Sequence, residues 1–167
     1  MGEMIHMRHR SLASGATVAA LYAVMTIALA PISYGPIQFR AAEALTLLPW
    51  YRAEAVSGLF VGCIVANFFG GYGPIDMIVG SCATLGAALL TRRAPVLWAA
   101  ALPPVALNAV VVGGMLHVLA DAPLLATCAW VGLGEAGACI LLGLPLMRGL
   151  ERCGLLVHDA VGRGADT

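Results

Sequence analysis

The sequence has 167 residues, of which 60% are hydrophobic and 11% are charged, and its formal net charge at pH 7 is zero. A soluble domain of this length cannot bury so much apolar surface, so the composition indicates a protein whose solvent is the lipid bilayer. The balanced charge excludes a bulk electrostatic attraction to nucleic acid.

Six apolar segments follow one another along the chain, and each is predicted to span the membrane. Their approximate bounds are 11–31, 41–51, 54–70, 76–91, 95–119 and 124–148. The second is weak, because as an α-helix it would rise only about 16 Å, whereas the hydrocarbon core is roughly 30 Å thick. We therefore expect it to be extended, tilted or partly re-entrant.

The predicted fold is an all-α integral membrane protein, a bundle of six transmembrane helices over residues 11–148. A cytoplasmic N-terminal segment (1–10) precedes the bundle and a cytoplasmic tail (149–167) follows it. All nine basic residues are Arg. In the six-span arrangement eight of them share one side with both termini, and the positive-inside rule makes that side cytoplasmic. A five-span arrangement still places seven inside, so charge favours six spans only slightly.

Polar residues gather in the middle and outer half of the predicted bundle, whereas the inner half is almost purely aliphatic. Ionisable groups inside a span cost at least a few kcal/mol each, so they are candidates for function. The outer loop at 31–40, rich in turn-forming residues, is a candidate lid over them. The candidate binding residues here are Gln38, Arg40, Glu43, Asn67, Asp76, Asn108 and Glu135.

Most of these residues also have a purely structural interpretation. Glu43 can pair locally with Arg40, three residues earlier on the same helical face. Asp76 can cap its helix, and the two asparagines can join helices by hydrogen bonds. Glu135 has the weakest alternative, because a lone carboxylate in the middle of a span needs a partner.

Two further groups of residues are candidates for contacts. The aromatic residues Phe39, Tyr72 and Trp130 lie on the outer side and can stack on a flat ligand, although an interfacial aromatic belt is the default interpretation. Small residues in the first span allow another helix to approach closely, either within the bundle or in a partner subunit. This predicted partner interface comprises Ala16, Ala19, Ala20 and Ala23.

Motifs for catalysis and for nucleotide binding are absent from the sequence. There is no GxxxxGK[ST] loop, no GxSxG and no HExxH, and the five cysteines and four histidines have no metal-ligand spacing. We therefore expect a non-catalytic protein without a metal or a cofactor. Energy for any active transport has to come from another subunit.

A specific pattern of residues carries a resemblance to a known family. The stretch APISYGPIQFRAAEALTLLPW (30–50) is followed by GLFVGCIVAN (58–67) and GSCATL (80–85). It resembles the QueT family of substrate-binding S components of energy-coupling factor (ECF) transporters. The core Q-F-R-x-x-E-A-L-x-L-L-P is rather specific, and the last third of the chain matches mainly by hydropathy.

The resemblance implies a six-helix bundle in the plasma membrane with both termini cytoplasmic and an outer ligand pocket closed by loops. It implies association with a transmembrane coupling subunit, which would face the alanine-rich first helix, and with two ATPase subunits. The implied ligand is a queuosine precursor, meaning a deazaguanine base or the related nucleoside. The alternatives are an S component for another small planar vitamin and a membrane scaffold without a transport role.

Overall fold

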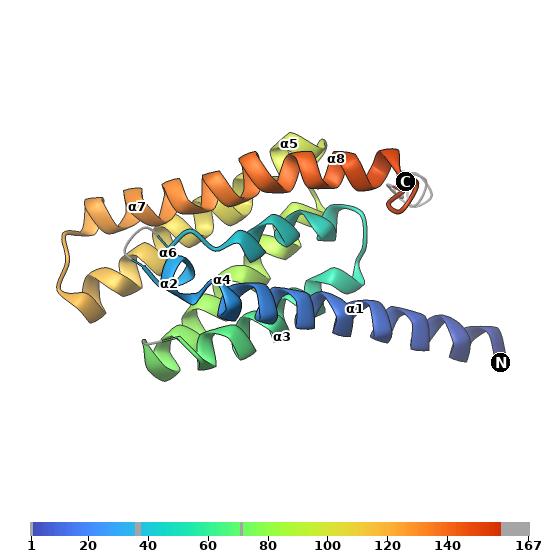
Figure 1. Ribbon diagram of the computed structural model, residues 1–167, viewed down its shortest axis with the longest axis horizontal. Helices are drawn as coiled ribbons and strands as arrows, with labels where there is room; N and C mark the ends of the chain where they lie inside the picture. Colours follow the sequence, from blue (N-terminus) through green and yellow to red (C-terminus); the bar gives the residue numbers. More distant parts are fainter. Residues whose placement is uncertain (1, 36–37, 71, 158–167) are drawn as a thin grey trace.

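The chain is all-helical over the residues that the computed structural model describes, which are 2–35, 38–70 and 72–157 (Figure 1). In chain order the helices are α1 (Gly2–Ala28), α2 (Ala30–Ser33), the 3₁₀-helix η1 (Ala41–Trp50), α3 (Glu54–Phe68), α4 (Gly73–Arg92), α5 (Leu97–Ala100), α6 (Leu102–Ala120), α7 (Leu124–Ala136), the π-helix η2 (Gly137–Gly143) and α8 (Leu144–Arg152). No strand occurs in these ranges, so the all-α prediction is confirmed.

The predicted number of six membrane spans is not confirmed. Among the described residues, four stretches are long and apolar enough to cross a bilayer: His9–Ala28, Gly73–Arg92, Leu97–Ala120 and Leu124–Arg152. They correspond to the first, fourth, fifth and sixth predicted spans. The third is α3, which is apolar but has only 15 residues, and the second is η1 with 10 residues. The fold is therefore a helical, multi-pass membrane bundle.

Helix η1 runs through the middle of this bundle. It contacts α1, α3, α4, α5, η2 and α8, and Figure 1 shows it between α1 and α8. Apart from Leu48 and Trp50, all of its residues are buried. Because a 3₁₀-helix rises about 2 Å per residue, η1 extends about 20 Å, further than an α-helix of equal length. The weak second span is thus a central, extended element that carries buried polar side chains.

Helices α1 and α3 approach each other closely at small residues. A Cβ atom at Gly58 would lie 2.5 Å from the carbonyl oxygen of Gly15, and one at Gly62 would lie 2.8 Å from that of Ala19. The stripe of small residues in the first span therefore packs partly inside the bundle, where Ala23 is also buried. Such backbone proximity is the usual role of small residues between membrane helices.

Helices near both ends of the chain continue beyond the predicted limits of the bundle, which are residues 11 and 148. Helix α1 begins at Gly2, so the predicted N-terminal segment 1–10 is helical where it is described. Helices α7, η2 and α8 run on from one another in Figure 1 and end at Arg152, beyond the predicted end of the sixth span. In the predicted tail, Leu156 packs in the cluster that contains Leu47 of η1. Residues 158–167 of that tail lie outside the described residues.

Candidate ligand-binding site

Arg40 lies at the centre of a buried polar cluster at the start of η1. It is 4% exposed. Its Nη1 donates to Oδ1 of Asn67 at 3.0 Å, and its Nη2 lies 3.9 Å from Oδ2 of Asp76. Its Nε donates to the carbonyl oxygen of Ser33 at 3.4 Å, and the guanidinium lies 5.5 Å from the centre of the Tyr34 ring. One cation therefore joins α2 to α3 and α4.

Asn67 and Asp76 connect α3 to α4 beside this cation. Asn67 uses both ends of its amide, because its Nδ2 donates to the carbonyl oxygen of Asp76 at 3.0 Å. Gly80 makes this arrangement possible, since a Cβ there would lie 2.7 Å from Nδ2 of Asn67 and 2.9 Å from Oδ1 of Asp76. Neither carboxyl oxygen of Asp76 has a hydrogen-bond partner, so its side chain does not cap α4.

Glu43 projects from η1 and is held by α1. Its Oε1 accepts a hydrogen bond from the Tyr22 hydroxyl, whereas its Oε2 is buried without a partner. Its backbone carbonyl accepts from Oγ1 of Thr46 at 2.6 Å and from Sγ of Cys139 at 3.5 Å. The local ion pair with Arg40 that the sequence spacing allowed is not formed, because Arg40 turns toward Asp76.

Glu135 has the partner that a carboxyl group in the middle of a span requires. Its Oε1 accepts from Nδ2 of Asn108 at 2.9 Å, and this bond joins α7 to α6. Oε2 of Glu135 and Oδ1 of Asn108 remain buried without partners. Cys139, four residues after Glu135, touches the backbone of Glu43 and thereby brings this pair next to η1.

Gln38 and Phe39 lead directly into η1. Gln38 has a φ of 50°, a left-handed conformation that costs a non-glycine residue about 1–3 kcal/mol. It is buried, and its Nε2 has no partner. The Phe39 ring packs against η2, because a Cβ at Gly137 would lie 2.9 Å from Cε2 of that ring. The predicted site residues of this segment therefore face the interior.

Tyr34, which directly follows α2, fastens the end of this helix to α3. Its hydroxyl donates to the carbonyl oxygen of Ala66 at 2.5 Å. Burial raises the pKa of the Tyr34 phenol above its ordinary value, and the nearby charge of Arg40 opposes that rise. The phenol stays protonated at neutral pH and keeps this bond.

Tyr72 and Trp130 do not join the polar cluster through any described hydrogen bond. Tyr72 packs against an apolar cluster that includes Val112 and Val131. Trp130 is 43% exposed on α7, as expected for a residue of an interfacial belt. Within the described part of the chain, no group of three or more His, Cys, Asp or Glu residues has the arrangement of a metal site.

The comparisons with known proteins agree with this architecture. The model of a family described as "QueT transporter" matches residues 12–152. The chain belongs to the QueT transporter family. The queuosine precursor transporter QueT of Lactococcus lactis subsp. cremoris (strain MG1363) is 40% identical to it over 72 residues, which are 42% of this chain and 42% of the relative. The aligned part thus spans less than half of that relative. No solved structure matches the chain.

Membership of the QueT transporter family also bears on where the chain resides. Together with the four long apolar helices, it makes the chain a multi-pass membrane protein. The residues of the cluster, from Tyr22 to Glu135, all lie within the part that the QueT model matches.

Several buried polar residues of this QueT-family site were missed by sequence reasoning. Tyr22 is fully buried and holds Glu43, and the hydroxyls of Ser33 and Ser81 are buried without partners. A usable signal existed for Tyr22, since a phenol inside an apolar span needs a hydrogen-bond partner. Serines give no such signal, because in a membrane helix their hydroxyls can bond to their own backbone.

Proposed function

We propose that this QueT-family chain is the substrate-binding subunit of an ECF-type importer and captures a queuosine precursor at the outer side of the membrane. The observation that carries the proposal is a set of buried polar atoms without partners. The acceptors are Oε2 of Glu43, both carboxyl oxygens of Asp76, Oδ1 of Asn108 and Oε2 of Glu135, and the donors are Nε2 of Gln38 and Nη2 of Arg40. The hydroxyls of Ser33 and Ser81 can act as either. Within this set, Nη2 of Arg40 and Oδ2 of Asp76 form an ion pair at 3.9 Å.

Acceptors outnumber donors in this set, so a complementary ligand is rich in N–H groups. A buried acceptor left without a partner costs about 1–3 kcal/mol, and this cost favours a ligand that supplies the missing hydrogen bonds. A deazaguanine has adjacent N–H donors on one edge, which a carboxylate such as Glu43 or Glu135 accepts in a paired geometry. Gln38 or Arg40 would donate to its carbonyl oxygen.

Asp76 is suited to a different part of the ligand. An aminomethyl substituent on the deazaguanine would be cationic, and a buried carboxylate favours a cation near it. The proximity of Arg40 balances the charge of Asp76 before the ligand arrives. We place the flat ring system near Phe39, which is already fixed against η2.

The segment between α1 and η1, which includes α2, acts as the lid in this proposal, although its residues 36–37 lie outside the described residues. It closes over Arg40 through the Ser33 carbonyl and is held to α3 by Tyr34. We expect ligand binding to order this segment further, which limited proteolysis measures. Equal protease sensitivity of this segment with and without ligand would contradict its role as a lid.

The energy for import is expected from a transmembrane coupling subunit and two ATPase subunits, because the sequence has no nucleotide-binding loop. A shallow groove of about 360 Å³ between α1 and α3 offers a contact for the coupling subunit. Ala16 lines it and is exposed, as is Ala20 on the same helix. The start of α1 and the end of α8 lie at one end of the bundle in Figure 1, which fits an arrangement with both termini cytoplasmic.

Calorimetric titration of the purified chain tests the proposal. The ligands are the queuosine-precursor bases, queuine and queuosine, with guanine and riboflavin as controls. Submicromolar binding to one deazaguanine species supports the proposal. Binding to riboflavin alone would favour an S component for another planar vitamin. No binding to any of these ligands would favour a membrane scaffold without a transport role.

Two site variants and one control make the titration specific. Glu43→Gln and Glu135→Gln each turn an acceptor into a donor, and we expect affinity to fall about 10- to 100-fold. Glu151→Gln is the matched control, because Glu151 is exposed on α8 and contacts Tyr51. Unchanged affinity in both site variants would contradict the assigned roles.

A further inference from the structure

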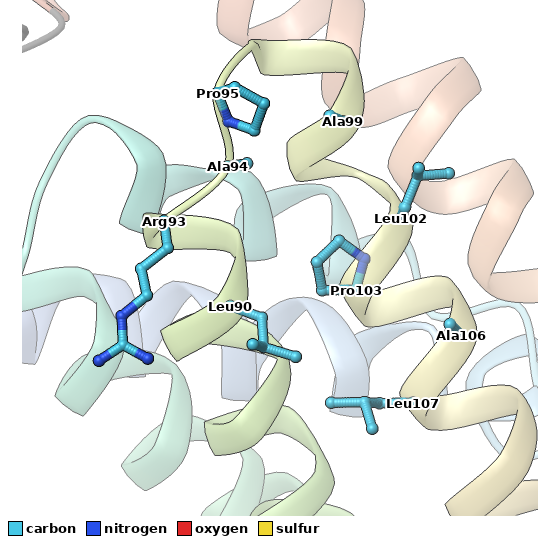
Figure 2. Close-up of a pocket in the computed structure, with 9 residues that line it drawn as sticks. All are labelled: Leu90, Arg93, Ala94, Pro95, Ala99, Leu102, Pro103, Ala106 and Leu107. Atoms are coloured by element: carbon cyan, nitrogen blue, oxygen red, sulfur yellow. The ribbon is translucent and has the colours of Figure 1, made fainter.

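A groove that is independent of the polar site separates the end of α4 from the start of α6 (Figure 2). Its volume is about 450 Å³, and every residue that lines it except Arg93 is Leu, Ala or Pro. Leu90 and Leu102 of its lining are 47% and 52% exposed. The groove is thus an apolar surface with a single cation among its lining residues.

The groove is closed at one end and narrows at the other. Figure 2 shows Leu90 and Leu107 pointing toward each other between the two helices, with the Ala94–Pro95 linker crossing the end. Farther along α4 the helices approach, because a Cβ at Gly86 would lie 3.4 Å from Cδ1 of Leu107. From Gly86 to Arg93 is about two helical turns, so the groove is about 10 Å long.

The closed end of the groove has the chemistry of a membrane surface. The exposed Arg93 directly follows α4, whose last residue is Arg92. Trp98 of the adjacent helix α5 is 60% exposed. Arg and Trp side chains concentrate at the level of lipid headgroups, and basic pockets between membrane helices bind anionic lipids.

We propose that this groove binds one anionic phospholipid, with an acyl chain between α4 and α6 and the phosphate on the guanidinium of Arg93. Figure 2 shows that guanidinium on the side of α4 opposite Leu90, so the side chain has to rotate to reach a phosphate at the end of the groove. Its exposure and length allow that rotation. A soluble anion would leave the apolar walls uncovered.

Native mass spectrometry of the delipidated, purified chain tests this site. The probes are phosphatidylglycerol and phosphatidylcholine with identical acyl chains, titrated separately. A basic residue near the surface contributes about 1 kcal/mol to the binding of anionic lipid, so we expect phosphatidylglycerol to bind about fivefold more tightly. Arg93→Gln is expected to abolish this preference and Arg93→Lys to keep it. Arg10→Gln, on α1 and away from the groove, is the charge-matched control.

A second variant tests the apolar part of the site. Ala106 is an exposed residue of the groove wall, so Ala106→Trp fills the groove without disturbing the core. We expect it to weaken the first binding event for both lipids. The proposal is overturned if the wild type has no preference, if Arg93→Gln behaves like Arg10→Gln, or if Ala106→Trp binds both lipids normally.

Discussion

Replacing Tyr22 by Phe tests whether α1 positions the acidic group of the proposed ligand site. The substitution keeps the fully buried ring and removes only the hydroxyl, which donates to Oε1 of Glu43 and lies 3.8 Å from Sγ of Cys63. Oε2 of Glu43 already lacks a partner, so the variant leaves the whole carboxyl group without a side-chain hydrogen bond. Losing a buried partner costs about 1–3 kcal/mol of the free energy of unfolding.

The informative readout is ligand affinity, measured by calorimetry beside the thermal midpoint Tm. We expect at least a tenfold loss of affinity for the queuosine precursor, which corresponds to about 1.4 kcal/mol. Thr26→Val is the control, because Thr26 is buried on the same helix and its hydroxyl bonds only to the carbonyl oxygen of Tyr22, at 2.8 Å. It is expected to lower Tm and leave affinity unchanged. Equal losses of affinity in both variants, or none in Tyr22→Phe, would refute the positioning role.

Three further substitutions probe the rest of the site by the same titration. Gly80→Ala places a methyl group 2.7 Å from Nδ2 of Asn67 and should abolish binding, whereas Gly114→Ala, with nothing within 4 Å, should bind normally. Asn108→Leu removes the amide that donates to Oε1 of Glu135 and should weaken binding about 10- to 100-fold. Arg40→Lys should lower both Tm and affinity. The two Nη groups of the guanidinium contact Asn67 on α3 and Asp76 on α4 at once, and a single ammonium group cannot reproduce this geometry. Wild-type values for any of the three site variants would contradict the geometry assigned to it.

The helical membrane class of the fold was predictable from composition and apolar runs alone. The geometry of the second span was not, because hydropathy reports burial and length but not the pitch of a helix. Glu43 and Thr46 are three residues apart. Because a 3₁₀-helix has three residues per turn, they lie on the same face of η1. The surrounding helices, which bury all of η1 except Leu48 and Trp50, decide this geometry.

The candidate site was predictable where a polar residue interrupts an apolar run. Glu43, Asp76 and Glu135 stood out because an ionisable group inside a span is costly, and the structure buries all three. The choice among partners was not predictable. Arg40 pairs with Asp76 on a distant helix instead of its near neighbour Glu43, since only the packing of α3 against α4 brings Asp76 within reach.

The position of η1 relates the proposed ligand site to the proposed partner surface. Glu43 is held by Tyr22, and Ala19 and Ala23 on the same helix pack inward beside it, while Ala16 and Ala20 face outward. A ligand that engages Glu43 therefore acts on a helix whose other face is available to a coupling subunit. Linkage makes this relation reciprocal: if docking of that subunit changes ligand affinity by some factor, the ligand must change the affinity of the subunit by the same factor. Measuring either affinity with and without the other partner then determines the coupling, and a factor of one would mean that Glu43 and the outer face of α1 act independently.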